Sequence, residues 1–194
     1  MNYPLQLRFK ILALAPQVYV QDASGAEVCY VKQKLLRFRE KVEVFTDSSR
    51  TTLRCTIQAD RIIDFNACYA FHMADGTVLG KVRRRGLRSL WSAHYEILDD
   101  SGNVVFEIRE QNPMVKFLEG LLDSIPLVGL FSGYFLHPHY VILQNGSPVL
   151  EMKKKPAFFE GRFSIEKSAN LDAQAEMRIV LSLVMFVLLE RSRG

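Results

Sequence analysis

Residues 171–191 read LDAQAEMRIVLSLVMFVLLER, and this stretch decides the fold of the chain. From Ile179 to Leu189 only Ser182 interrupts the apolar residues. On a helix of 3.6 residues per turn these side chains point in every direction, so the helix must be surrounded by apolar groups. A membrane span needs about 20 apolar residues, and this run is shorter. We therefore expect a buried core helix, with a membrane tail anchor as the alternative.

Short strands joined by tight turns fill most of the chain before this helix. Four times, two β-prone runs flank a turn that contains Asp or Asn together with Gly, which is typical of β-hairpins. The four predicted hairpins are residues 18–34, 71–85, 94–110 and 140–155. Further strands are expected at residues 41–45, 51–59, 61–65 and 162–167, and the first strand at the run ILALA, residues 11–15.

Residues 112–138 interrupt this succession of strands and turns. Asn112 followed by Pro113 is typical of a helix start, and apolar residues at helical spacing predict a short helix that ends near Leu122. The next segment, residues 125–136, reads IPLVGLFSGYFL and carries no charge. It is either a buried connection or an apolar surface for a membrane or a partner.

These elements fit together in one architecture. A sheet must bury one face, and a closed barrel of about eleven strands is wide enough to hold a central helix. Without the interruption at residues 112–138, residues 1–167 accommodate about twelve strand-plus-turn units of roughly 12 residues each. We therefore predict a mainly β (α+β) fold: a closed antiparallel barrel of about twelve strands around the buried C-terminal helix. It forms a single domain over residues 1–194, into which residues 112–138 are inserted.

This pattern resembles the tubby C-terminal-like superfamily, which includes the LURP-one-related proteins and the phospholipid scramblases. The resemblance rests on the tandem hairpins with Asp/Asn-Gly turns, on KVRRRGLRSLW (residues 81–91) followed by HYEILDDSGNVVFEI (94–108), and on the terminal apolar helix. It spans nearly the whole chain as a pattern. It implies a closed barrel and, as in several members, binding to phosphoinositide or another membrane lipid. The Pro-rich segment and the cysteine cluster of scramblases are not found in this sequence.

Composition narrows the class of protein. The chain is 48% hydrophobic and 24% charged, which is ordinary for a globular protein, and its net charge of +4 does not by itself demand nucleic acid. Its cysteines, Cys29, Cys55 and Cys68, are odd in number and form no C-x-x-C motif. This favours free thiols in a reducing compartment, and we expect a cytoplasmic protein.

Motifs for catalysis or metal binding are incomplete. Residues 76–81 (GTVLGK) lack the spacing and the Ser or Thr of a P-loop, and residues 129–133 (GLFSG) place the serine one position late for a nucleophile elbow. His137 and His139 have no carboxylate or thiol near them in sequence. We therefore expect no enzyme, no catalytic residue, no cofactor and no metal site.

Clustered cations are the clearest surface signal. They follow the second strand of several hairpins, and alternating strand directions would gather them at one end of the barrel. Such clusters favour anionic headgroups or phosphates, although a solvated strand face is the simpler alternative. Nucleic acid is not favoured because aromatic residues are not interleaved with the basic runs. The candidate anion-binding residues are Lys81, Arg83, Arg84, Arg85, Arg88, Lys153, Lys154 and Lys155.

The sequence thus predicts a non-catalytic binding module for anionic phospholipid headgroups, peripheral at a membrane surface and without a transmembrane span. The alternative is a protein–protein scaffold, or a self-associating protein, that uses the apolar segment 125–136.

Overall fold

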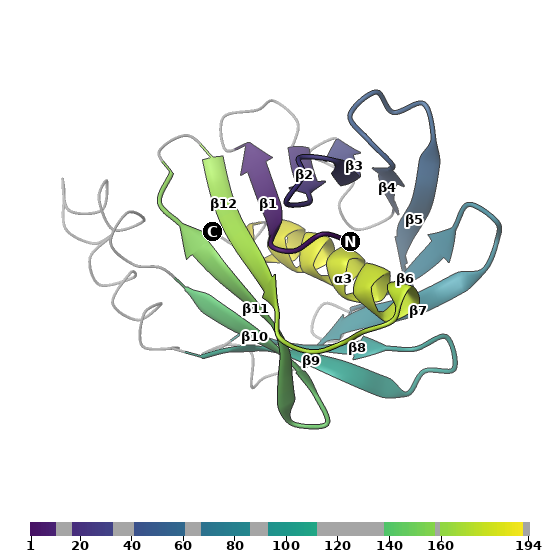
Figure 1. The fold of residues 1–194 in the computed structure, drawn as a ribbon. Helices are drawn as coiled ribbons and strands as arrows, with labels where there is room; N and C mark the ends of the chain where they lie inside the picture. Colours follow the sequence, from purple (N-terminus) through teal and green to yellow (C-terminus); the bar gives the residue numbers. More distant parts are fainter. Residues whose placement is uncertain are drawn as a thin grey trace, which may run out of the picture.

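The computed structural model describes residues 1–10, 17–32, 41–60, 67–85, 93–111, 138–157 and 160–191. These residues form a closed barrel of twelve antiparallel strands around one helix, as predicted (Figure 1). The expected helix at 112–122, the apolar segment 125–136 and the expected strand at 61–65 lie outside the described residues.

The strands are short and follow one another around the barrel wall. Their bounds are β1 (Leu5–Lys10), β2 (Gln17–Gln21), β3 (Glu27–Lys32), β4 (Lys41–Phe45), β5 (Leu53–Ala59), β6 (Cys68–Met73), β7 (Val78–Arg84), β8 (His94–Leu98), β9 (Val104–Glu110), β10 (His139–Gln144), β11 (Ser147–Lys155) and β12 (Glu160–Lys167). Each strand pairs with its neighbours in the chain, and β12 closes the barrel on β1, with Leu7 opposite Phe163.

The first strand does not lie where the sequence suggested. It is β1, Leu5–Lys10, and the run ILALA at residues 11–15 comes after it, outside the described residues. In β1 the buried residues Leu5 and Leu7 alternate with half-buried Gln6 and Arg8. This alternation is the signature of a strand with one wet face, which a continuous apolar run such as ILALA does not carry.

Alternation of this kind fills the barrel interior. Inward-facing residues of neighbouring strands lie opposite one another, for example Val44 opposite Cys55 and Ile57 opposite Phe71. Cys29 and Cys55 are free thiols in this buried layer. Burial raises the pKa of each thiol to about 12, so neither is a reactive thiolate at neutral pH.

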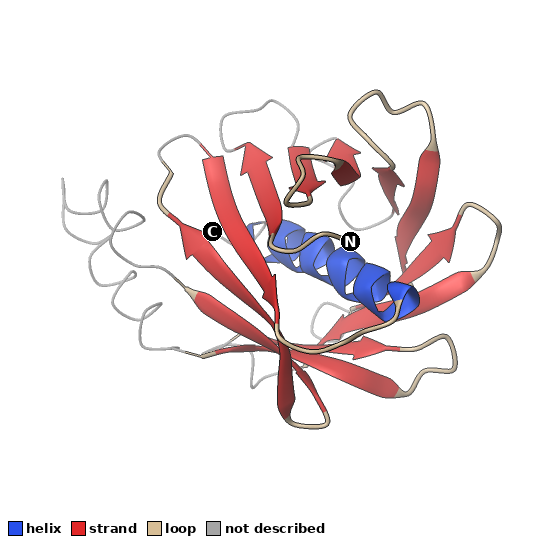
Figure 2. Cartoon of the chain, in the orientation of Figure 1, coloured by secondary structure: helices blue, strands red, loops and turns tan. Residues whose placement is uncertain are grey.

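The helix α3 (Ala173–Arg191) passes through the barrel and is ringed by strands (Figure 2). Every residue from Ile179 to Leu188 is buried. The ring of Phe186 packs edge-on against Tyr95 of β8 at 5.1 Å and Tyr140 of β10 at 4.8 Å between centroids. The expected core helix is therefore confirmed. Among the described residues, no helix has the length and apolarity that a membrane span requires.

Polar groups fix the position of α3 along the barrel axis. Arg178 Nε donates to the carbonyl oxygen of Leu79 at 2.8 Å, and the buried Glu176 accepts from Lys167 Nζ at 2.6 Å. At the other end, Arg191 donates to the carbonyl oxygen of Lys10 at 2.8 Å. The helix therefore begins beside the end of β12 and ends beside the end of β1.

Because neighbouring strands are antiparallel, successive connections lie at alternate ends of the barrel. All odd-numbered strands run in one direction, so the four predicted hairpin turns meet at one end. At one of these turns Asn145 and Gly146 have φ of 50° and 80°, as an Asn-Gly hairpin requires. We call this end the turn rim; it consists of residues 22–26, 46–52, 74–77, 99–103, 145–146 and 168–172.

Gly80 supplies a test of how tightly the wall closes on the helix. Its φ is +150°, and an added Cβ would lie 2.3 Å from the carbonyl oxygen of Leu98 and 2.8 Å from Arg178 Nε. Because the strand backbone cannot move away, we expect Gly80→Ala to lower the free energy of unfolding by about 3 kcal/mol or more. Urea denaturation measures this loss.

Gly76, in the turn of the same hairpin, is the matched control. Its φ is +86°, but an added Cβ would meet nothing within 4 Å. Gly76→Ala should therefore cost only the backbone strain, about 1 kcal/mol. Equal losses in the two variants would contradict the close approach of Gly80 to Leu98 of β8 and to Arg178 of α3.

Candidate anion-binding rim

Opposite the turn rim, basic residues gather at the other end of the barrel. There the odd-numbered strands end, the even-numbered strands begin, and α3 ends. We call this end the basic rim and count the three terminal residues of each of these elements. Its cations are Arg8, Lys10, Lys32, Lys41, Arg83, Arg84, Arg109, Lys153, Lys154, Lys155, Arg162 and Arg191. Its carboxylates are fewer: Glu43, Glu96, Glu110, Glu160 and Glu190.

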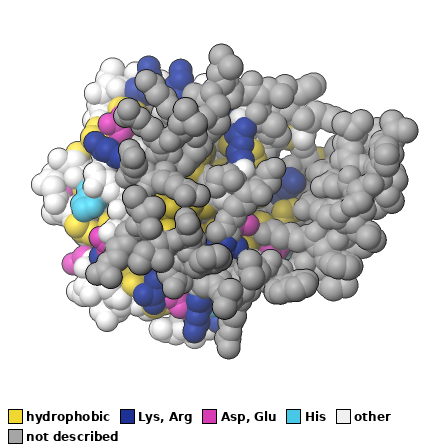
Figure 3. All heavy atoms as spheres, turned by 180° about the vertical axis from the view of Figure 1, so that it is seen from behind, with side chains coloured by type: hydrophobic (Ala, Val, Ile, Leu, Met, Phe, Trp, Pro, Cys, Tyr) yellow, Lys and Arg dark blue, Asp and Glu magenta, His cyan; other side chains and the backbone are white. Residues whose placement is uncertain are grey.

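The two predicted basic groups lie at this rim but not side by side. Strand β7 carries Lys81 to Arg84, β11 carries Lys153 to Lys155, and three strands separate them. At a strand spacing of about 4.8 Å, the groups are roughly 19 Å apart along the wall. Figure 3 shows Lys and Arg at several separate places among the coloured, described residues, with Asp and Glu near them. The described cations are therefore spread over separate places rather than gathered in a single pocket.

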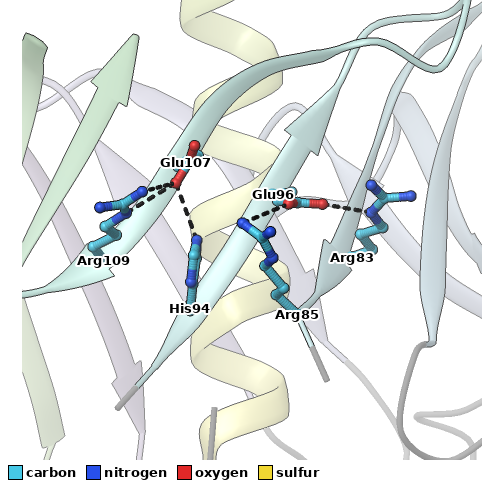
Figure 4. Close-up of polar contacts among 6 residues, drawn as sticks. All are labelled: Arg83, Arg85, His94, Glu96, Glu107 and Arg109. Atoms are coloured by element: carbon cyan, nitrogen blue, oxygen red, sulfur yellow. Dashed lines mark hydrogen bonds and ion pairs between the residues drawn. The ribbon is translucent and has the colours of Figure 1, made fainter. Parts of the chain in front are cut away.

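Two predicted arginines share one buried carboxylate on the outer face of β7 and β8. Arg83 Nε lies 2.7 Å from Glu96 Oε2, and Arg85 Nη1 lies 3.4 Å from Glu96 Oε1 (Figure 4). The Glu96 side chain is only 9% exposed, whereas those of Arg83 and Arg85 are 44% and 49% exposed. The carboxylate thus holds both guanidinium groups at the surface and neutralises one of the two charges.

A second carboxylate lies on β9, next to the first. Glu107 Oε2 is 2.6 Å from Arg109 Nη2 and 3.1 Å from His94 Nε2 (Figure 4). Partial burial alone would raise the pKa of Glu107, but hydrogen bonds from Arg109 and His94 outweigh it and lower the pKa below its ordinary value. These contacts continue the row of ion pairs across the outer face of β7, β8 and β9.

Lys81 and Lys153 are also paired with carboxylates. Lys81 Nζ lies 2.9 Å from Asp60, and Lys153 Nζ lies 2.7 Å from Glu151 and 3.7 Å from Glu166. The hydrogen bond to Asp60 raises the pKa of Lys81, and the one to Glu151 raises the pKa of Lys153. Both side chains therefore stay cationic, and each has a carboxylate beside it.

Arg84 faces the barrel interior, unlike its neighbours. It lies opposite Tyr95, whose hydroxyl donates to Glu190 of α3 at 2.8 Å. Successive residues of a strand point to opposite faces, so a run of three arginines cannot present all its side chains on one surface. Arg88 lies outside the described residues.

Four lysines of the basic rim have no carboxylate partner among the described residues: Lys10, Lys32, Lys154 and Lys155. The Lys10 ammonium group lies 5.6 Å from the centre of the Tyr19 ring. Lys32 and Lys155 are exposed at the ends of β3 and β11. Two of these lysines, Lys154 and Lys155, were predicted as site residues.

Closure of the barrel adds cations that sequence reasoning missed. Arg162 of β12 lies opposite Lys155 of β11 on one side and Arg8 of β1 on the other. Arg162 donates to Glu160 at 2.6 Å. No local sequence signal joins residues at the two ends of the chain; only the pairing of β1 with β12 brings them together.

The described residues offer no metal site, and the comparisons with known proteins give no relative. Within the described ranges, no group of three His, Cys, Asp or Glu side chains could hold a metal ion. His139 instead lies 3.3 Å from Glu151. The sequence matched no protein-family model, and comparisons with curated proteins and with solved structures also gave no match.

The Glu107 contacts predict a pH-dependent contribution to stability. Glu107→Gln should lower the free energy of unfolding at neutral pH by about 0.5–1 kcal/mol. Because the pKa of Glu107 is lower in the folded than in the unfolded chain, this contribution is complete above the ordinary value of 4.5 and is lost as the pH falls through the folded-state pKa. Denaturant titrations of both proteins between about pH 7 and pH 3 should therefore converge at the acidic end.

Glu43 is the control for this experiment. Its side chain is 53% exposed and lies 3.7 Å from Lys41. Glu43→Gln should leave stability nearly unchanged at every pH. A Glu107→Gln deficit that stayed constant down to the acidic end would show that ionisation of Glu107 is not its cause.

Proposed function

We propose that this protein is a non-catalytic binding module that docks on anionic phospholipid headgroups at a membrane surface through its basic rim. The convergence of cations from β1, β3, β7, β11 and β12 at one end of the barrel is the observation that carries the proposal. Clustered cations of this kind attract anionic surfaces and steer the approach to them.

The helix in the barrel supports a function on the outside. Binding and catalytic barrels use their interior or its mouth for ligands. Here the buried side chains of α3, from Ile179 to Leu188, occupy the space inside the wall. A binding role at the outer surface, rather than an enzymatic one, fits this arrangement best.

The basic rim contains two kinds of cation with different parts in the proposal. Arg83 and Lys153, together with Arg85 directly after β7, are held by carboxylates and give the surface a fixed positive lining. Lys10, Lys32 and Lys155, which lie on the outer face of their strands and lack such partners among the described residues, are the groups best placed to bind headgroup phosphates. Lys154 lies opposite Phe163 on the inner face of the wall. Each cation near an anionic membrane contributes about 1 kcal/mol to binding.

A tubby C-terminal-like identity belongs to the same proposal. A closed barrel around a central helix is what that resemblance implies, and lipid binding in several of its members agrees with the charge at the basic rim. A cytoplasmic, peripheral location would follow. The scaffold function stays a prediction, because residues 125–136 lie outside the described residues.

Vesicle binding tests the proposed function. The wild-type protein should bind mixed phosphatidylserine–phosphatidylcholine vesicles and should not bind pure phosphatidylcholine vesicles. A variant with Lys10, Lys32 and Lys155 changed to Gln should bind the anionic vesicles about a hundredfold more weakly, since three contributions of about 1 kcal/mol each are removed. Cosedimentation at several salt concentrations measures both affinities.

Single substitutions at the two rims give a charge-matched control. Lys155→Gln should weaken binding about fivefold, whereas Arg50→Gln, which removes the same charge from the turn rim, should have little effect. Equal affinity of the wild-type protein for anionic and neutral vesicles would rule out the proposed function.

A further inference from the structure

The two rims of the barrel carry opposite charge. Among the described residues, the basic rim has more cations than carboxylates. The loops of the turn rim have six aspartates and one basic side chain, Arg50. At the adjoining chain and strand ends, the N-terminal ammonium group, Arg54 and Lys167 are accompanied by Glu27 and Glu166. The aspartates of the turn rim are Asp22, Asp47, Asp75, Asp99, Asp100 and Asp172. The described barrel therefore has an electrical polarity along the axis of α3.

The turns themselves favour the ionised form of four of these carboxylates. Asp75 Oδ1 accepts hydrogen bonds from the backbone nitrogen of Thr77 at 2.9 Å and from its hydroxyl at 2.6 Å. Asp22 and Asp47 make the same contacts with the serines two residues further on, and Asp99 accepts from the Asn103 amide. Hydrogen bonds from these side chains and from the backbone lower the pKa of all four aspartates.

The distance between the rims determines whether the charges of the turn rim interact with a surface that the basic rim contacts. The helix that runs from one rim to the other has 19 residues, which corresponds to about 28 Å at 1.5 Å per residue. Charges are screened over about 8 Å at physiological ionic strength. When the basic rim touches an anionic surface, the charges of the turn rim are therefore too far from that surface to interact with it. In an inverted or side-on pose the aspartates would be at the surface and repelled.

We infer that the barrel docks on anionic lipid in a single orientation, with the basic rim against the headgroups, α3 steep to the membrane plane and the turn rim facing away. The turn aspartates are orientation determinants: they exclude the other poses and do not contribute to affinity. This inference rests on the proposed function and extends it to the geometry of the docked protein.

Fluorophores at the two rims report the orientation. Ser101 in a turn and Pro156 after β11 are both exposed and uncharged, so each can be changed to Cys and labelled. Cys29 and Cys55 are buried, and half-buried Cys68 is changed to Ala to prevent labelling there. On phosphatidylserine–phosphatidylcholine vesicles with a headgroup quencher, the label at Pro156→Cys should be quenched and the label at Ser101→Cys should not.

Neutralising the turn rim should change orientation without changing affinity. The variant carries Asp22→Asn, Asp47→Asn, Asp75→Asn and Asp99→Asn, because Asn keeps the oxygen that accepts the turn hydrogen bonds. At about 0.15 M salt its affinity should stay within about twofold of wild type, while the Ser101→Cys label becomes partly quenched. At about 0.01 M salt, where screening extends to about 30 Å, its affinity should rise several-fold.

One carboxylate at the basic rim serves as the contrasting control. Glu43→Gln removes a single negative charge close to the docked surface and should raise affinity by about two- to fivefold at 0.15 M salt, with no change in orientation. At this salt concentration, removing one negative charge at the basic rim should therefore change the affinity for vesicles more than removing four at the turn rim.

The outcomes separate the inference from the function on which it rests. Equal quenching of the Ser101→Cys and Pro156→Cys labels in the wild-type background would overturn the single orientation and leave lipid binding intact. If quenching of the Ser101→Cys label stayed unchanged in the four-Asn variant, the aspartates would not be the cause of the single orientation. Failure of wild-type protein to bind anionic vesicles would overturn the proposed function and this inference together.

Discussion

Contact between an all-apolar helix and the inner face of a closed sheet is the interaction on which the rest of the structure depends. A helix without a polar stripe has to be covered on every side, and a sheet with one apolar face has to bury it. Twelve strands around α3 satisfy both requirements at once. Closure also removes the exposed edges that a long sheet would otherwise present to other chains.

The two ends of this filled barrel differ in structure and in charge. Because neighbouring strands alternate in direction, every tight Asp/Asn-Gly turn falls at the turn rim, and the basic strand ends fall at the opposite rim. Polarity of charge is therefore a consequence of where the sequence places aspartates and lysines within each hairpin. On the outer face, carboxylates such as Glu96 and Glu107 hold arginines in fixed positions, so part of the positive charge lines the wall in ion pairs.

Much of the fold could be predicted from sequence because its signals are local. Turn residues mark the hairpins, and the apolar run 179–189 marks the buried helix. The site could be predicted only in part, since it depends on strand pairing. Arg83 and Arg85 pair with Glu96 across β7 and β8, Arg84 points inward, and Arg162 meets Arg8 only through barrel closure. The position of the first strand was mistaken because a continuous apolar run outweighed the shorter alternation in Leu5–Lys10.

Native-state hydrogen exchange of α3 tests the central claim most directly, that the barrel and its helix form one cooperative unit. If the wall cannot persist without its filling, the amides of Ile179 to Leu188 exchange only through global unfolding. Their opening free energy should then equal that of the amides in β1 and β12, where the barrel closes. Rapid exchange of the α3 amides, while those of β1 and β12 remain protected, would contradict the account.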